Sequence, residues 1–294
     1  MDGLGDLPGD ERVQQAQADE VARLRAELDA ARQEQEAFLR AVSHDLRAPV
    51  RHILAYGRLV RETVAQSNAD PEALQFLDTI AQAGQQLGSM IDGLIQLGRI
   101  GSAPVTPGPV ALGPVLQSAV AAARTAAAAA PALKKSAAAK EPASSGEGVA
   151  SAWIDTVHWD LPAVEACPVL WADAGWLQEV LVALLDNALK FSRGAQPPRI
   201  AVQVRPAPGD RVDITVQDNG AGFPAAQAGQ LFQVFQRLHP ASQFEGLGLG
   251  LARCRRLVAR MGGTIGISAA PHQGCTVCLQ LPAARSAGPD AAAS

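Results

Sequence analysis

Apolar residues recur at intervals of three and four through the first hundred positions of the chain. In the first stretch they are Val21, Leu24, Leu28, Ala31, Phe38 and Val42, and only Gln35 interrupts the spacing. In the second stretch they are Leu77, Ile80, Gly84, Leu87, Ile91 and Leu94. This spacing predicts two long amphipathic helices, the first of them a coiled-coil seam that runs into a bundle helix.

A turn separates the two helical patterns at residues 67–71. Asp70 is suited to cap the N-terminus of the second helix, and Pro71 to occupy its first position. Two long helices joined by a short loop predict an antiparallel hairpin. Because such a hairpin cannot bury both apolar stripes by itself, we expect a homodimer that forms a four-helix bundle.

Alternating apolar and polar positions replace the helical spacing in the second half of the chain. They predict strands at residues 199–206, 212–218, 264–268 and 274–281. Helical spacing returns at residues 174–191 and 250–261, and residues 110–124 read as a short strand followed by a helix. An α+β domain is therefore expected after the helical hairpin.

Composition places the boundaries between these parts. Residues 101–109 are rich in Pro and Gly, and residues 121–152 are rich in Ala, Lys and Ser with little periodicity. The expected order is a coiled-coil signalling helix at 1–36, the hairpin at 37–101, a linker at 102–109, the α+β domain at 110–282 with a flexible insertion at about 121–152, and a disordered tail at 283–294.

The charge and hydropathy of the chain exclude several classes of function. The formal net charge is −4, which is not the footprint of a nucleic-acid binder. The most apolar window, residues 110–133, is interrupted by Pro114, Arg124 and Pro131, so no membrane span is expected. The four cysteines have no framework spacing, and we interpret Cys275 and Cys278 as structural thiols. A cytoplasmic protein is expected.

Three local motifs carry candidate chemistry for binding a nucleotide. Asn187 and Lys190 share one helical face, where an amide oxygen can bind Mg²⁺ and an ammonium can meet phosphate. Asp218 ends a predicted strand, where its carboxylate can accept a hydrogen bond from an exocyclic amine, although Asp-Asn-Gly is also an ordinary turn. The glycines that open the next helix offer N–H groups to phosphates, and they are Gly246, Gly248 and Gly250.

His44 is the candidate acceptor of a phosphoryl group. It follows Ser43 and precedes Asp45 on the first predicted helix. At 100° per residue it lies about 200° from Val42 and from Leu46, which places it on the exposed side of the bundle. His52 and His239 are expected at the surface or behind ligand-binding residues, because their spacing pairs neither with a carboxylate.

Taken in order, these motifs resemble those of two-component sensor histidine kinases. SHDLRAP at 43–49 resembles the phosphoacceptor box, DNALKF at 186–191 the Asn box, DNGAGF at 218–223 the first glycine box, LFQVFQRL at 231–238 the Phe box and GLGLGLA at 246–252 the second glycine box. The resemblance extends over residues 37–282, and SHDLRAPVRHI and FQRLH look most like the phytochrome-associated subtype.

The resemblance implies a phosphotransfer hairpin followed by an ATP-binding domain of the Bergerat fold, an α+β sandwich. His44 would attack the γ-phosphate of ATP through Nε2, while Asp45 would accept the Nδ1 proton as general base. Asn187 would bind Mg²⁺, Lys190 would contact phosphate, and Asp218 would recognise the adenine amine.

The same resemblance implies roles for the glycines and for the loop between them. Gly220 and Gly222 would shape the purine pocket, whereas Gly246, Gly248 and Gly250 would lie beside the phosphates. Residues 223–245 would form a mobile lid, with Phe232 and Phe235 packing it down and Arg237 contacting phosphate.

Two positions depart from the family pattern. Ala183 stands where a second Asn often precedes the Mg²⁺ ligand, and Ala48 stands where Thr or Asn often positions water for dephosphorylation. The expected partners are a second copy of the chain, a response-regulator receiver domain and an upstream sensory partner. Two alternatives stay open: an ATPase of the gyrase, chaperone and mismatch-repair fold group, and a nucleotide-binding dimeric scaffold that transfers no phosphate.

Overall fold

The computed structural model describes residues 17, 20–24, 46–65, 71–129, 153–240 and 243–284. It divides into two compact units, Met1–Ala103 and Pro104–Ser294, each of which is considered by itself. His44 and Asp45 lie outside the described residues, as do most of the expected coiled coil and residues 130–152.

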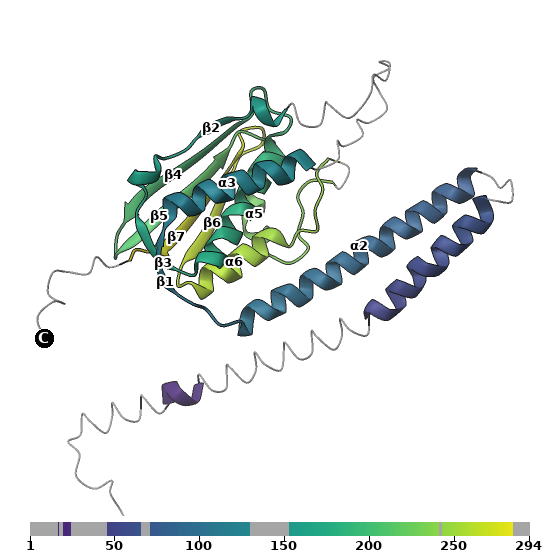
Figure 1. The fold of residues 1–294 in the computed structure, drawn as a ribbon, viewed down its shortest axis with the longest axis horizontal. Helices are drawn as coiled ribbons and strands as arrows, with labels where there is room; N and C mark the ends of the chain where they lie inside the picture. Colours follow the sequence, from purple (N-terminus) through teal and green to yellow (C-terminus); the bar gives the residue numbers. More distant parts are fainter. Residues whose placement is uncertain are drawn as a thin grey trace, which may run out of the picture. The chain divides into compact units, whose positions relative to one another are not determined.

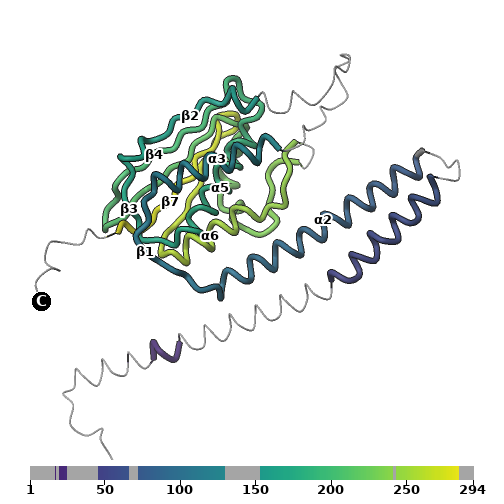
Figure 2. Tube along the Cα trace, in the orientation of Figure 1, coloured from purple at the N-terminus to yellow at the C-terminus, as the bar shows by residue number. Residues whose placement is uncertain are grey.

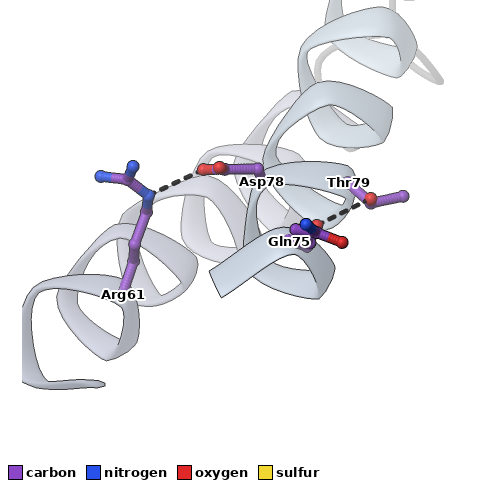
Figure 3. A network of polar contacts seen from close by, with 4 residues as sticks. All are labelled: Arg61, Gln75, Asp78 and Thr79. Carbon is purple, nitrogen blue, oxygen red and sulfur yellow. Dashed lines mark hydrogen bonds and ion pairs between the residues drawn. The ribbon is translucent and has the colours of Figure 1, made fainter. Parts of the chain in front are cut away.

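The first unit contains the expected helical hairpin (Figure 1). A helix over residues 46–65 runs antiparallel to α2 (Pro71–Ser102), so the hairpin prediction is confirmed. Two ion pairs of 2.7 Å join these helices, Arg47–Asp92 and Arg61–Asp78, and residue numbers rise on one helix as they fall on the other. Figure 3 shows the second pair beside the bond from the Thr79 hydroxyl to the Gln75 carbonyl, 2.8 Å long.

The two helices approach closely near the middle of the hairpin. A Cβ added to Gly84 would lie 2.9 Å from Cδ2 of Leu54, so this glycine permits the contact. A single hairpin nevertheless leaves much of its apolar surface uncovered. Large apolar side chains that are at least 44% exposed are Leu46, Ile53, Tyr56, Leu59, Val60, Phe76, Ile80 and Leu87.

The second unit is a two-layer α+β sandwich. Its elements in chain order are β1 (Gly108–Ala111), α3 (Leu112–Ala129), η1 (Ile154–Thr156), β2 (His158–Asp160), η2 (Val164–Ala166), β3 (Val169–Ala172), α5 (Ala174–Ser192), β4 (Arg199–Ala207), β5 (Arg211–Asp218), η3 (Ala225–Gln230), α6 (Gly250–Arg260), β6 (Thr264–Ala269) and β7 (Cys275–Pro282). Helices α3, α5 and α6 cover one face of the large sheet (Figures 1 and 2). The expected strands and helices of this domain are confirmed.

The large sheet has the strand order β2-β4-β5-β7-β6, and β1 pairs with β3 in a separate two-stranded sheet. Strand β2 is parallel to β4, and the other neighbours in the large sheet are antiparallel. In β5 every second side chain is buried, namely Val212, Ile214, Val216 and Asp218. The period of two therefore places the Asp218 carboxylate on the face that carries the apolar core.

The structure corrects the expected start of the insertion. Residues 121–129, assigned to a flexible insertion, form the last two turns of α3. Alanine has the highest helix propensity, and Ala123 and Ala127, four residues apart, are buried. An alanine run without apolar periodicity can thus still be a packed helix.

The expected linker and tail are also shorter than predicted at their ends. Helix α2 continues to Ser102, and β1 begins at Gly108. At the other end, the amide of Ala283 donates to the Asp210 carbonyl and that of Ala284 to the Val169 carbonyl, at 2.8 and 2.9 Å. These bonds extend the pairing of the domain two residues beyond β7.

Asp173 fixes the start of α5. Its Oδ1 accepts hydrogen bonds from the amides of Gly175 and Trp176, at 3.0 and 3.1 Å, which is the geometry of an N-cap. Its Oδ2 accepts a third bond, of 3.0 Å, from the amide of Thr106 in the connector before β1. One carboxylate therefore binds both the connector and the N-terminus of α5.

Across the described ranges, none of the helices combines the length and the apolar character that a bilayer crossing requires.

Candidate functional site

A pocket of about 460 Å³ lies in the second unit, between α5, the ends of β5 and β7, and the segment that leads into α6. Most of the residues singled out from the sequence line it. They are Asn187, Lys190, Asp218, Gly222, Arg237, Gly246, Gly248 and Gly250. Gly220 lies next to the pocket and donates its amide hydrogen to Asp218, whereas His44 and Asp45 belong to the part of the chain that is not described.

Asp218 provides a buried acceptor in the pocket. In the sheet it lies between Ile200 and Cys275, and its side chain is 6% exposed. Burial raises the pKa of this carboxyl to about 6, although the amides of Gly220, at 2.8 Å, and Cys275 partly oppose the rise by donating hydrogen bonds to it. The carboxylate is therefore held in place with lone pairs still facing the pocket.

The turn after Asp218 requires glycine at position 222. Gly222 has a φ of +60°, and a Cβ at this position would lie 2.0 Å from the carbonyl oxygen of Ala270. A larger residue would have to push the 270–274 turn away from the pocket. The first glycine motif is thus a tightly packed wall of the pocket.

Asn187 and Lys190 face the pocket from α5. The Lys190 ammonium donates to Oδ1 of Asn187 at 3.2 Å and lies 4.4 Å from the ring centroid of Phe191. Burial lowers the pKa of Lys190, while Asp186 and Glu245 act in the opposite direction. The two side chains therefore share one corner, with an ammonium and an amide oxygen side by side. Ala183 is half-buried one turn earlier on α5.

The segment expected as a lid has two parts. Its first part, which includes η3, contacts β6, and Phe223 and Phe232 are buried. Its second part, described at residues 235–240 and 243–245, contributes to the lining of the pocket through residues 236–239, Phe244 and Glu245. Arg237 bonds with its Nη2 to the Phe244 carbonyl at 2.5 Å, so this guanidinium braces the loop and also lines the pocket.

Several residues of the pocket were given no individual role from the sequence. Asp186, Phe191, Phe244, Glu245 and Cys275 all line it. Asp186 and Phe191 immediately flank the motif residues Asn187 and Lys190, which was the available signal. Cys275 is the β7 neighbour of Asp218, a relation that follows from the sheet register and not from the sequence spacing. Burial, followed by the Asp218 charge, raises the pKa of its thiol to about 12.

Comparison with known proteins identifies two domain families. Residues 34–103 match the His Kinase A (phospho-acceptor) domain, and residues 172–285 match the family of histidine kinase-, DNA gyrase B- and HSP90-like ATPases. The two matches coincide with the hairpin and with the domain that holds the pocket.

Individual relatives agree with these matches. The sensor protein KdpD of Mycobacterium tuberculosis is 32% identical over 84% of the chain, and cyanobacterial phytochrome A of Nostoc sp. is 24% identical over 90%. The chain spans only 26% and 31% of those proteins. The crystal structure of full-length ShkA in complex with AMPPNP matches with a TM-score of 0.53 at 22% identity, covering 85% of this chain and 46% of that one, which establishes similarity of fold.

Proposed function

Because the chain belongs to the two-component sensor histidine kinases, of which it contains the transmitter module, we propose that it transfers the γ-phosphoryl group of ATP to His44. From His44 the phosphoryl group would pass to an aspartate of a response-regulator receiver domain. The reaction would take place in the cytoplasm, where ATP is available.

The observation that carries this proposal is the distribution of polar groups in the pocket. Asp218 offers a buried acceptor for the adenine amine. Lys190, Asn187 and the glycines before α6 offer an ammonium, an amide and backbone N–H groups for the phosphates. Both ends of the same nucleotide therefore have a matching group.

The residues of this corner also fit Mg²⁺. Asn187 supplies an amide oxygen, and Asp186 and Glu245 line the same pocket, so the available donors are the hard oxygens that Mg²⁺ prefers. Within the described residues no three His, Cys, Asp or Glu side chains form a metal site, so the phosphates and water would complete the coordination. When bound, Mg²⁺ would neutralise developing charge on the phosphates.

The proposed reaction moves one phosphoryl group from ATP to the imidazole of His44. Nε2 of the neutral imidazole forms a bond to the γ-phosphorus, the bond from that phosphorus to the β–γ bridging oxygen breaks, and ADP leaves with the electron pair. The proton on Nδ1 passes to the Asp45 carboxylate. Lys190 holds the phosphates through charge, and Asp218 holds the base, so the protein contributes mainly by positioning.

Incubation with γ-labelled ATP and Mg²⁺ tests the proposal. A label on the protein that is lost in acid and stable in alkali supports phosphohistidine. Release of phosphate without a labelled protein would instead indicate an ATPase. Nucleotide binding without either product would indicate a scaffold. If Mg²⁺ is chelated before ATP is added, no label should form on the protein.

We also propose that the hairpin pairs with a second copy of itself. The apolar residues left exposed on the helix over 46–65 include Ile53, at 51%, and Leu59, at 56%. On α2 they include Phe76, at 61%. A four-helix bundle would cover such stripes, which a single hairpin cannot do. Sedimentation of the full chain should give the mass of a dimer.

A threonine at position 48 is expected to increase dephosphorylation of the cognate regulator. Ala48 is exposed on the helix over 46–65, four positions after His44 in the sequence, and its methyl group cannot orient water by hydrogen bonding. Replacing Ala48 with Thr should raise phosphatase activity severalfold without changing autophosphorylation. The measurement is loss of label from the phosphorylated regulator. Replacing Ala48 with Val gives the matched control without a hydroxyl, and equal rates for Thr and Val would contradict the prediction.

The pH dependence of nucleotide binding should report on Asp218. Its pKa is raised to about 6, so the carboxyl gains a proton as the pH falls from about 7 to 5. The adenine amine donates to the ionised carboxylate, so nucleotide binding lowers the pKa of Asp218. The affinity for nucleotide is therefore constant at a pH above the pKa of the nucleotide-free protein. It falls as the pH drops below that pKa. The loss approaches a factor of about ten per pH unit below 6, until the pKa of the complex is reached. Titration of the Kd for a fluorescent ATP analogue measures it, and a flat profile between pH 7 and 5 would exclude this role.

A further inference from the structure

Three aromatic rings meet at the edge of the nucleotide pocket. His239 lies with its ring centroid 5.1 Å from that of Phe244 and 5.7 Å from that of Phe191, and the two phenylalanines are 4.8 Å apart. Phe191 belongs to α5, whereas His239 and Phe244 belong to the second part of the lid segment. The cluster therefore packs this segment onto the helix that carries Asn187 and Lys190.

His239 also makes a hydrogen bond to the first glycine turn. Its Nε2 lies 3.0 Å from the carbonyl oxygen of Gly222. A carbonyl oxygen can only accept, so Nε2 carries the hydrogen in this contact. Because Gly222 is packed against the 270–274 turn, the bond attaches His239 to a rigid part of the pocket wall.

The loop on which His239 lies is closed by two further bonds. The amide of Phe235 donates to the Gly248 carbonyl at 3.0 Å, and the Arg237 guanidinium donates to the Phe244 carbonyl. These bonds hold the loop to itself and to the second glycine turn. His239 adds a connection to the first glycine turn, at Gly222. The loop is in this way attached to both glycine turns that line the pocket.

From these contacts we propose that His239 is a positioning residue that fastens the described part of this loop, residues 235–240 and 243–245, over bound ATP. This inference rests on the proposed function, since ATP is the ligand that the loop would retain. The imidazole acts in two ways: its ring fills the space between Phe191 and Phe244, and its Nε2–H holds Gly222. A loop that is already fastened has less freedom to lose on binding, so the nucleotide binds more tightly and leaves more slowly.

This role predicts a separation between binding and chemistry. Replacing His239 with Ala should weaken nucleotide binding about tenfold, because both the ring contacts and the hydrogen bond are lost. The autophosphorylation rate at saturating ATP should stay within about twofold of the original, since Asn187, Lys190 and Asp218 are untouched. Most of the loss in affinity should appear as faster dissociation.

Two intermediate variants test the two contacts separately. His239→Phe retains a ring without the hydrogen bond, and His239→Gln retains an N–H donor without the ring. Each should weaken binding severalfold, less than His239→Ala does. His158→Ala is the matched control, because His158 is an exposed histidine of the same domain, on β2, and its loss should change nothing.

The experiment measures the Kd of a fluorescent ATP analogue and its release rate on the full chain, together with kcat and KM for autophosphorylation. Thermal melting establishes that each variant is folded, and if His239→Ala unfolds, the Phe and Gln variants carry the test. Affinity equal to that of the original chain in all three variants, or a loss confined to kcat, overturns the proposal. Absence of binding by the original chain would refute the inference and the proposed function together, whereas binding without phosphorylation would refute the function alone.

Discussion

Replacing His44 with glutamine is expected to remove all transfer of the γ-phosphate to the protein. Glutamine approximates the length of the side chain, but its amide nitrogen has no available lone pair and cannot attack phosphorus. No phosphoramidate can then form, so the acid-labile, alkali-stable label should fall to the background of the assay. The measurement is incubation with γ-labelled ATP followed by separation of the protein under alkaline conditions.

The same variant should bind nucleotide as well as the original chain does. The pocket is built entirely from residues of the Pro104–Ser294 unit, and His44 belongs to the other unit. His52→Gln provides the matched control, because His52 is an exposed histidine of the hairpin, eight positions later in the sequence. A label that survives in His44→Gln, or one that disappears in His52→Gln instead, would assign the acceptor to another residue.

Replacing Asp218 with asparagine is expected to weaken ATP binding by roughly 10- to 100-fold, since a buried hydrogen bond to a charged group contributes about 1.5–3 kcal/mol. The carboxylate already accepts from the amides of Gly220 and Cys275. Asparagine has only one oxygen, and its NH₂ group cannot accept from an N–H donor. At least one of the three bonds to Gly220, Cys275 and the adenine amine must therefore be lost.

The preference of the protein for adenine over guanine nucleotides should change in the same variant. Guanine has a carbonyl oxygen where adenine has an amine, so the NH₂ group of asparagine can donate to it. The preference for ATP over GTP should collapse in Asp218→Asn, and the pH dependence of binding should flatten. Asp213→Asn is the control, because Asp213 is on the same strand with its side chain on the opposite face, where it accepts from Gln280 at 3.1 Å. An unchanged preference for ATP would exclude Asp218 from base recognition.

The sequence was most informative where one local pattern determined both structure and chemistry. The alternation in β5 predicts a strand, and the same alternation places Asp218 on its buried face. The three-residue spacing of Asn187 and Lys190 predicts one helical face, and both side chains line the pocket. The positions of these side chains are set mainly by the helix or strand to which each residue belongs.

His239 and Phe244 could not be assigned in that way. They lie on a loop that has no regular secondary structure. This loop is held by the hydrogen bond from Arg237 to Phe244 and by that from Phe235 to Gly248. The tertiary packing that brings them to Phe191 has no periodic pattern in the sequence. The end of α3 was predicted as part of an insertion although it is helical. A run of alanines does not reveal which positions are buried, and only the contact with α5 distinguishes them.

The three hydrogen bonds of Asp173 have a mechanical consequence. A force that pulls on the connector at Thr106 acts on the same carboxylate that caps α5. Tension along the chain therefore reaches α5, which carries Asn187 and Lys190, without passing through the sheet. The connector cannot slip by one residue unless that helix loses its cap. Thr106 and the start of α5, the helix from which Asn187 and Lys190 face the pocket, are thus joined through a single side chain.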